Sequence, residues 1–108
     1  MVGERELRAM KPTAYLINIS RGQIVDQPVL IRALQEGWIA GAGLDAFDPE
    51  PLPGDNELWE MPNVIMSPHM AGSTDRRSHH LVAFFQENLR RYLAGKPLLN
   101  VIDKNTKY

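Results

Sequence analysis

Residues 13–22 read TAYLINISRG, a short apolar run followed by polar residues and a glycine. The run is rich in β-branched and aromatic side chains and is almost continuously apolar. Such a run is typical of a strand that is covered on both faces in a parallel sheet. Arg21 and Gly22 end it. We therefore expect a buried strand at 13–19 whose carboxyl end carries Arg21.

A helix is predicted directly after this strand. Asp26 suits its N-cap, Pro28 suits its first turn, and Gly37 suits its left-handed end. Residues 39–47 then form a second strand, and its many glycines and alanines indicate that a helix or a cofactor lies close to the backbone. The order of strand, helix and strand predicts an α/β fold with a parallel sheet.

The rest of the chain predicts a long loop, a third strand and a last helix. Residues 48–62 contain four prolines and Gly54, so they form neither a helix interior nor a central strand. Residues 64–66 are the third strand. Ser73 or Thr74 can cap the last helix. Its expected apolar face consists of Leu81, Val82, Phe85, Leu89, Tyr92 and Leu93.

Composition and charge argue against several classes of partner. The chain has 108 residues, 12 basic and 13 acidic side chains and no cysteine. It has no long basic block, so a nucleic-acid partner is not expected. It has no apolar run of bilayer length and no thiolate for a metal site, so neither a membrane nor a metal is expected. A cytoplasmic location is the default expectation.

Four polar residues each follow a short apolar run: Arg21, Asp45, Glu50 and His69. In an open parallel sheet, ligands bind beyond the carboxyl ends of the strands, so these side chains are candidates for one site. Each of them has an ordinary interpretation when taken alone. Arg21 could be a solvated loop arginine, Asp45 a cap, Glu50 a loop charge and His69 a hydrogen-bonded strand-end histidine. Their joint order favours the site.

Five motifs in a fixed order carry a family resemblance. They are LINISRG at 16–22, ALQEG at 33–37, GAGLDAF at 41–47, EPLP at 50–53 and SPHMAG at 67–72. With these motifs, nearly the whole chain resembles the C-terminal part of the NAD-dependent D-2-hydroxyacid dehydrogenase family, and in particular glyoxylate and hydroxypyruvate reductases.

The resemblance implies part of a Rossmann-like, doubly wound parallel sheet of three strands with flanking helices. Residues 1–78 would be the C-terminal half of an NAD-binding domain. Residues 79–108 would be a long C-terminal helix and a tail that returns toward a substrate domain absent from this chain.

The resemblance also implies the roles of individual residues. Arg21, Glu50 and His69 are the expected catalytic residues: Arg21 binds the substrate carboxylate, and the Glu50–His69 pair moves the proton. Guanidinium offers a planar fork for a carboxylate, and a hydrogen-bonded carboxylate fixes the imidazole tautomer and favours the imidazolium form. The expected contacts with the cofactor, NAD or NADP, come from Ser20, Arg21, Asp45, His69 and Gly72, with Asp45 at the nicotinamide carboxamide.

Departures from the family indicate a fragment of an oxidoreductase. The Gly-x-Gly-x-x-Gly turn that would hold the cofactor pyrophosphate is missing, and so is the family's N-terminal substrate domain. Gln27–Pro28, where an acidic start is more usual, is a mild departure that touches none of the charged site residues. We expect a natural polypeptide roughly three times longer. That protein would be a homodimer and would act on a small 2-keto or 2-hydroxy acid. The alternative is a non-catalytic NAD-sensing or protein-interaction module built on the same fold.

Overall fold

The computed structural model describes residues 1–105, which form two compact units. One unit comprises residues 1–72, and the other begins at Ser73. The first unit contains all six residues predicted to contact substrate or cofactor. The last three residues of the expected tail, 106–108, lie outside the described residues.

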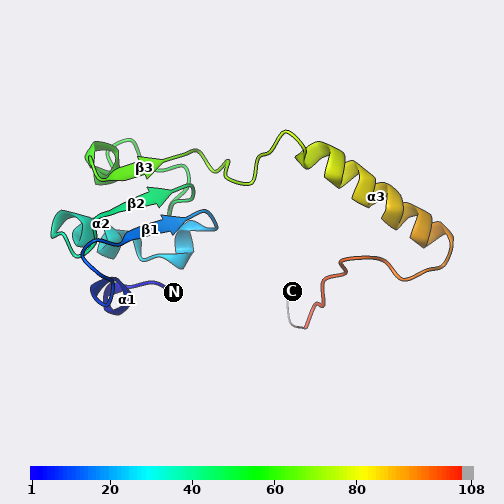
Figure 1. Ribbon diagram of the computed structural model, residues 1–108, viewed down its shortest axis with the longest axis horizontal. Coiled ribbons are helices and arrows are strands. Elements are labelled where there is room, and N and C mark those ends of the chain that lie inside the picture. The colour runs from blue at the N-terminus through cyan, green and yellow to red at the C-terminus, as the bar shows by residue number, and fades with distance from the viewer. Residues whose placement is uncertain (106–108) are drawn as a thin grey trace. The chain divides into compact units, whose positions relative to one another are not determined.

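Three parallel strands form the sheet of the first unit, in the order β1–β2–β3 (Figure 1). Strand β1 is Tyr15–Asn18, β2 is Gly41–Leu44 and β3 is Val64–Met66. The α/β fold and the three predicted strands are confirmed, although β1 and β2 are shorter than the sequence indicated. Because all three strands run the same way, their carboxyl ends meet at one edge of the sheet.

Helix α2, Gln27–Gln35, connects β1 to β2 and begins and ends as the sequence predicts. The backbone N–H of Val29 donates to Asp26 Oδ1 over 3.2 Å, which caps the helix. Pro28 lies in its first turn. Gly37 has a φ of 70°, the left-handed conformation that glycine adopts most easily.

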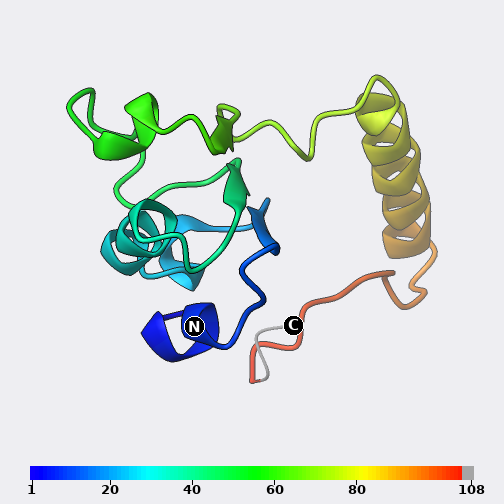
Figure 2. The ribbon, with the colours of Figure 1, turned by 60° about the vertical axis from the view of Figure 1, so that its left-hand side comes forward.

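Helix α1, Glu4–Arg8, packs against α2. The N–H of Gly3 donates to Glu6 Oε2 over 3.0 Å, and this bond, followed by one from Arg5, lowers the pKa of Glu6 to about 2. Leu7 is fully buried. The two helices lie on one side of the sheet (Figure 2) and enclose its core. The buried core comprises Leu7, Val25, Leu30, Ala33, Leu34, Ile39, Ala42, Leu44, Phe47, Leu52 and Leu58.

The opposite face of the sheet is uncovered within the first unit. Tyr15 and Ile17 are each 66% exposed and Ile65 is 80% exposed. The expectation that the first strand is covered on both faces is therefore wrong for these residues, because α1 and α2 both pack on the other face. The glycines of β2 lie close to other parts of the chain: a Cβ on Gly41 would lie 2.5 Å from the carbonyl oxygen of Asn63, and a Cβ on Gly43 would lie 2.9 Å from Ile17 Cδ1.

The segment between β2 and β3 is a loop that contains the 3-10 helix η2, Glu57–Glu60. Asn56 caps this helix by accepting the N–H of Leu58 over 3.0 Å, and Leu58 is buried. A second 3-10 helix, η1 at Gly22–Ile24, follows β1. The proline-rich loop predicted at 48–62 is thus confirmed and is anchored on the core through Leu58.

The second unit contains helix α3, Arg77–Leu93. The predicted cap by Ser73 or Thr74 is wrong: Arg76 is the N-cap, without a side-chain hydrogen bond, and Thr74 contributes its backbone carbonyl to the N–H of Arg77. No residue of α3 is buried, so its apolar residues are exposed in this unit. No helix among residues 1–105 combines the length and apolar character that crossing a membrane requires.

Candidate functional site

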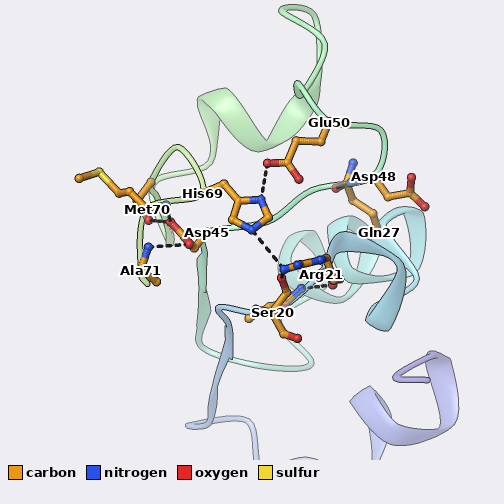
Figure 3. A network of polar contacts seen from close by, with 11 residues as sticks. Ser20, Arg21, Gln27, Asp45, Asp48, Glu50, His69, Met70 and Ala71 are labelled. Atoms are coloured by element: carbon orange, nitrogen blue, oxygen red, sulfur yellow. Dashed lines mark hydrogen bonds and ion pairs between the residues drawn. The ribbon is translucent and has the colours of Figure 1, made fainter. Parts of the chain in front are cut away.

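Four polar side chains meet beyond the carboxyl ends of the strands (Figure 3). Arg21 follows β1, Asp45 follows β2, and His69 follows β3. Glu50 comes from the loop after Asp45. The sequence predicted that these four lie together, and the parallel register of the sheet explains why they do.

His69 lies between Glu50 and Arg21, and the three side chains form a polar relay. Its Nδ1 is 2.7 Å from Glu50 Oε1, and its Nε2 is 3.3 Å from Arg21 Nη1. Guanidinium has no acceptor, so Nε2 must accept from Arg21. The ring proton then lies on Nδ1 and is donated to Glu50. The two contacts thus fit the Nδ1–H tautomer, with Nε2 facing Arg21.

A buried amide fixes the turn that carries Arg21. Asn18 Nδ2 donates to the carbonyl of Arg21 over 2.9 Å, and Asn18 Oδ1 accepts the N–H of Ser20 over 3.1 Å. Asn18 is only 6% exposed, so these bonds replace contacts with water. The Arg21 side chain folds back, and Nη1 donates to the carbonyl of Ser20 over 2.7 Å. Asn18 therefore holds the backbone of the turn, and the Arg21 side chain is exposed.

Asp45 is buried and accepts hydrogen bonds from its own chain. Oδ1 accepts from Ser67 Oγ at 2.6 Å and from the N–H of Met70 at 2.8 Å. Oδ2 accepts from the N–H of Ala71 at 2.8 Å. These bonds hold the turn around His69. The φ of His69 is 52°, which lies in the left-handed region that residues other than glycine rarely adopt.

The same bonds make Asp45 a stronger acid. The hydrogen bond from Ser67 lowers the pKa of Asp45 most, and burial opposes it. The N–H groups of Ala71 and Met70 and the nearby His69 lower the pKa further. Asp45 is therefore a buried carboxylate that stays ionised at neutral pH.

The two remaining predicted residues occupy different places. Ser20 lies in the Arg21 turn, where its backbone is engaged by Asn18 and by Arg21. Gly72 is the last residue of the first unit, after the turn that follows His69. Asn18 and Ser67 were missed, although both are polar residues at or just after a strand end, which was the available signal.

A pocket of about 650 Å³ adjoins Glu50. Trp59 forms part of its wall and is 51% exposed, with its Nε1 donating to the carbonyl of Pro53. The pocket is lined by Phe47, Glu50, Pro51, Leu52, Trp59, Met66, Ser67 and Pro68.

Comparison with known proteins identifies the family of this chain. The family model described as "D-isomer specific 2-hydroxyacid dehydrogenase, NAD binding domain" matches residues 1–71. The chain belongs to this family. The description itself names NAD, in line with the cofactor class expected from the sequence.

Curated relatives of this dehydrogenase family include glyoxylate reductases. That of Korarchaeum cryptofilum is 44% identical over 104 residues, which cover 96% of this chain and 31% of the relative. That of Thermococcus litoralis is also 44% identical, with 31% of its length covered. The chain thus spans about a third of the length of these relatives.

Solved structures of the family agree in fold. A D-isomer specific 2-hydroxyacid dehydrogenase from Xanthobacter autotrophicus, in complex with NADPH and MES, matches with a TM-score of 0.86 and 41% identity. The match covers 97% of this chain and 43% of that protein. An NADPH-dependent glyoxylate/hydroxypyruvate reductase from Sinorhizobium meliloti, in complex with NADP and sulfate, has a TM-score of 0.88 and 30% identity. This second match covers 99% of this chain and 35% of the reductase.

Proposed function

We propose that the protein carrying this chain is an NAD(P)-dependent oxidoreductase that interconverts small 2-keto and 2-hydroxy acids. The observation that carries the proposal is the relay from Glu50 through His69 to Arg21. Glyoxylate and hydroxypyruvate are the first substrates to test, because relatives are named for their reduction.

The residues at the site fit a nicotinamide cofactor. A carboxylate has about four lone-pair sites, so buried Asp45 is able to accept an amide N–H in addition to its own-chain donors. The set that we propose for the cofactor is completed by Ser20, Arg21, His69 and the backbone around Gly72. When bound, the cofactor would supply or accept the hydride at the substrate C2.

Arg21 and His69 would share the work on the substrate. Arg21 binds the carboxylate through its planar fork, and protonated His69 donates its Nε2 proton to the keto oxygen. Carbon C2 gains the hydride, the oxygen gains the proton, and the C=O double bond becomes a single bond. His69 returns to the neutral form and keeps its Nδ1–H on Glu50. Oxidation of the hydroxy acid is the reverse, with His69 as the base.

The test uses His69→Ala in the complete polypeptide that contains this chain. General acid–base catalysis is typically worth about 10²–10⁴-fold, so keto-acid reduction should fall by that factor. His79→Ala is the matched control, because His79 is an exposed histidine of α3 and belongs to the second unit. We expect the control to retain its turnover.

Two outcomes would contradict the proposal. One is unchanged turnover of every reduced keto acid in His69→Ala. The other is a complete wild-type protein that binds NAD or NADP but reduces no 2-keto acid, which would favour the sensing or interaction module instead.

A further inference from the structure

Segment 22–27 and segment 47–50 are fastened together beside the site. At Gly22 the two backbones nearly touch: a Cβ there would lie 1.9 Å from the carbonyl oxygen of Phe47. The N–H of Asp48 donates to Gln27 Oε1 over 3.1 Å, and Gln23 Nε2 donates to Asp48 Oδ1 over 3.2 Å. The first segment directly follows Arg21, and the second carries Glu50. The fastening therefore connects the two residues that flank His69.

Of the two glutamines, Gln27 is placed to control the backbone. Gln27 is 8% exposed, whereas Gln23 is exposed and reaches only a side chain. The bond between Gln27 and Asp48 is partly sheltered from water, so breaking it leaves the Asp48 N–H with a poorer choice of partners. Figure 3 shows the Gln27 side chain directed at Asp48.

The backbone between Asp48 and Glu50 is short and conformationally restricted, so the position of Asp48 constrains that of Glu50. Only Pro49 separates the two residues, and Pro51 follows Glu50. A proline ring fixes φ near −65°, so the chain here has few ways to absorb a displacement. A shift of the Asp48 amide would consequently move the Glu50 carboxylate, which lies only 2.7 Å from His69 Nδ1.

We infer that Gln27 is a positioning residue: its side-chain carbonyl holds the Asp48 amide and so sets where Glu50 meets His69. The expected effects on kcat and KM rest on the proposed function. The structural meaning of the inference is the tautomer of His69: Glu50 accepts the Nδ1–H over 2.7 Å, and if Glu50 is displaced, only the longer contact of 3.3 Å with Arg21 still favours a proton on Nδ1. Arg21 is held separately by Asn18, so substrate binding should depend little on Gln27.

The experiment compares Gln27→Met with Gln27→Glu in the complete polypeptide. Methionine has a similar length but no strong acceptor, and glutamate keeps a carboxylate oxygen in place of the amide oxygen. For Gln27→Met we expect kcat to fall about tenfold, a part of the acid–base contribution, with KM within about twofold of the wild type. Gln27→Glu should restore most of kcat.

Ring-nitrogen NMR shifts of His69 supply a readout that does not need activity. The wild type should show the Nδ1–H tautomer, Gln27→Met a mixture of both tautomers, and Gln27→Glu the wild-type form. Gln35→Met is the matched control, since Gln35 lies on the same helix and bonds to the exposed Glu57, away from the relay. It should leave both the tautomer and kcat unchanged.

Either of two results would overturn the inference: a wild-type tautomer and kcat in Gln27→Met, or a Gln27→Glu variant that behaves like Gln27→Met. If Gln27→Met fails to fold, Gln27→Asn takes its place, because it withdraws the acceptor by one methylene; a wild-type tautomer there would overturn the inference too. Failure of the proposed function is distinguishable, since it would appear as an inactive wild type or an active His69→Ala protein.

Discussion

The guanidinium of Arg21 faces the ring nitrogen of His69 through which the proton would pass, with Nη1 and Nε2 3.3 Å apart. Protonation of Nε2 would leave two donors facing each other, so this contact cannot coexist with the imidazolium form. A substrate with a carboxylate and a neighbouring carbonyl would accept from both groups. The contact therefore marks where such a substrate fits.

Arg21→Lys should weaken substrate binding more than chemistry. Lysine keeps the charge but loses the planar fork, and hydrogen bonds to charged groups contribute about 1.5–3 kcal/mol. We expect kcat/KM for the keto acid to fall by about ten- to a hundredfold, mainly through KM, in steady-state assays. Arg5→Lys, at a highly exposed arginine, should be neutral. Equal kinetics for Arg21→Lys and the wild type would exclude bidentate binding.

Asn18→Ala should reproduce part of this defect without changing any charge. It removes the amide that holds the backbone of Ser20 and Arg21. Loss of a buried partner costs about 1–3 kcal/mol, so both the free energy of unfolding and kcat/KM should decrease.

Asn56→Ala is the control, because it removes the cap of η2 and leaves the Arg21 turn intact. Thermal denaturation combined with kinetics separates the two variants. If Asn56→Ala lowers kcat/KM as much as Asn18→Ala does, the effect of Asn18 is general destabilisation.

Asp45→Asn should lower stability in a pH-dependent way. The pKa of Asp45 is lowered in the folded protein, chiefly by the hydrogen bond from Ser67. The ionised carboxylate therefore stabilises the folded state relative to the unfolded state. This contribution is complete above the unfolded pKa of about 3.9 and is lost as the pH falls through the lower folded value.

Melting temperatures of the wild type and Asp45→Asn should thus differ most near pH 7, begin to converge below about pH 4, and meet only below the lowered folded pKa. Asp55→Asn, in the exposed loop, should track the wild type throughout. A constant difference between Asp45→Asn and the wild type at every pH would show that ionisation of Asp45 does not contribute.

Gly22→Ala should destabilise the first unit. The added methyl group would meet the backbone of Phe47 and Asp48, which cannot move aside as a flexible side chain could. Overpacking of this kind costs about 1–3 kcal/mol, occasionally more, which denaturant unfolding would measure.

Gly54→Ala serves as the comparison, because a Cβ at Gly54 meets nothing within 4 Å. Its free energy of unfolding should stay within about 0.5 kcal/mol of the wild type. Similar losses in both variants would mean that the close approach of segments 22–27 and 47–50 is unimportant.

Local signals in the sequence predicted most of the elements. The two ends of α2 were predicted from Asp26 and Gly37, because a cap and a left-handed turn depend on only a few neighbouring residues. The same logic failed at α3, where Thr74 uses its backbone and Arg76 takes the cap position. Burial of Tyr15 and Ile17 was also mispredicted, because an apolar strand does not reveal which of its faces the chain itself covers.

By itself, the sequence determined the parallel α/β pattern and the order of Arg21, Asp45, Glu50 and His69 after their apolar runs. Only the tertiary structure decided the pairing: Arg21 with His69, 48 residues apart, and Gln27 with the Asp48 amide, 21 residues apart. Capping and strand ends follow from interactions within one turn of chain. Contacts over such separations follow from the register of the sheet and from the close approach at Gly22, which no local pattern encodes.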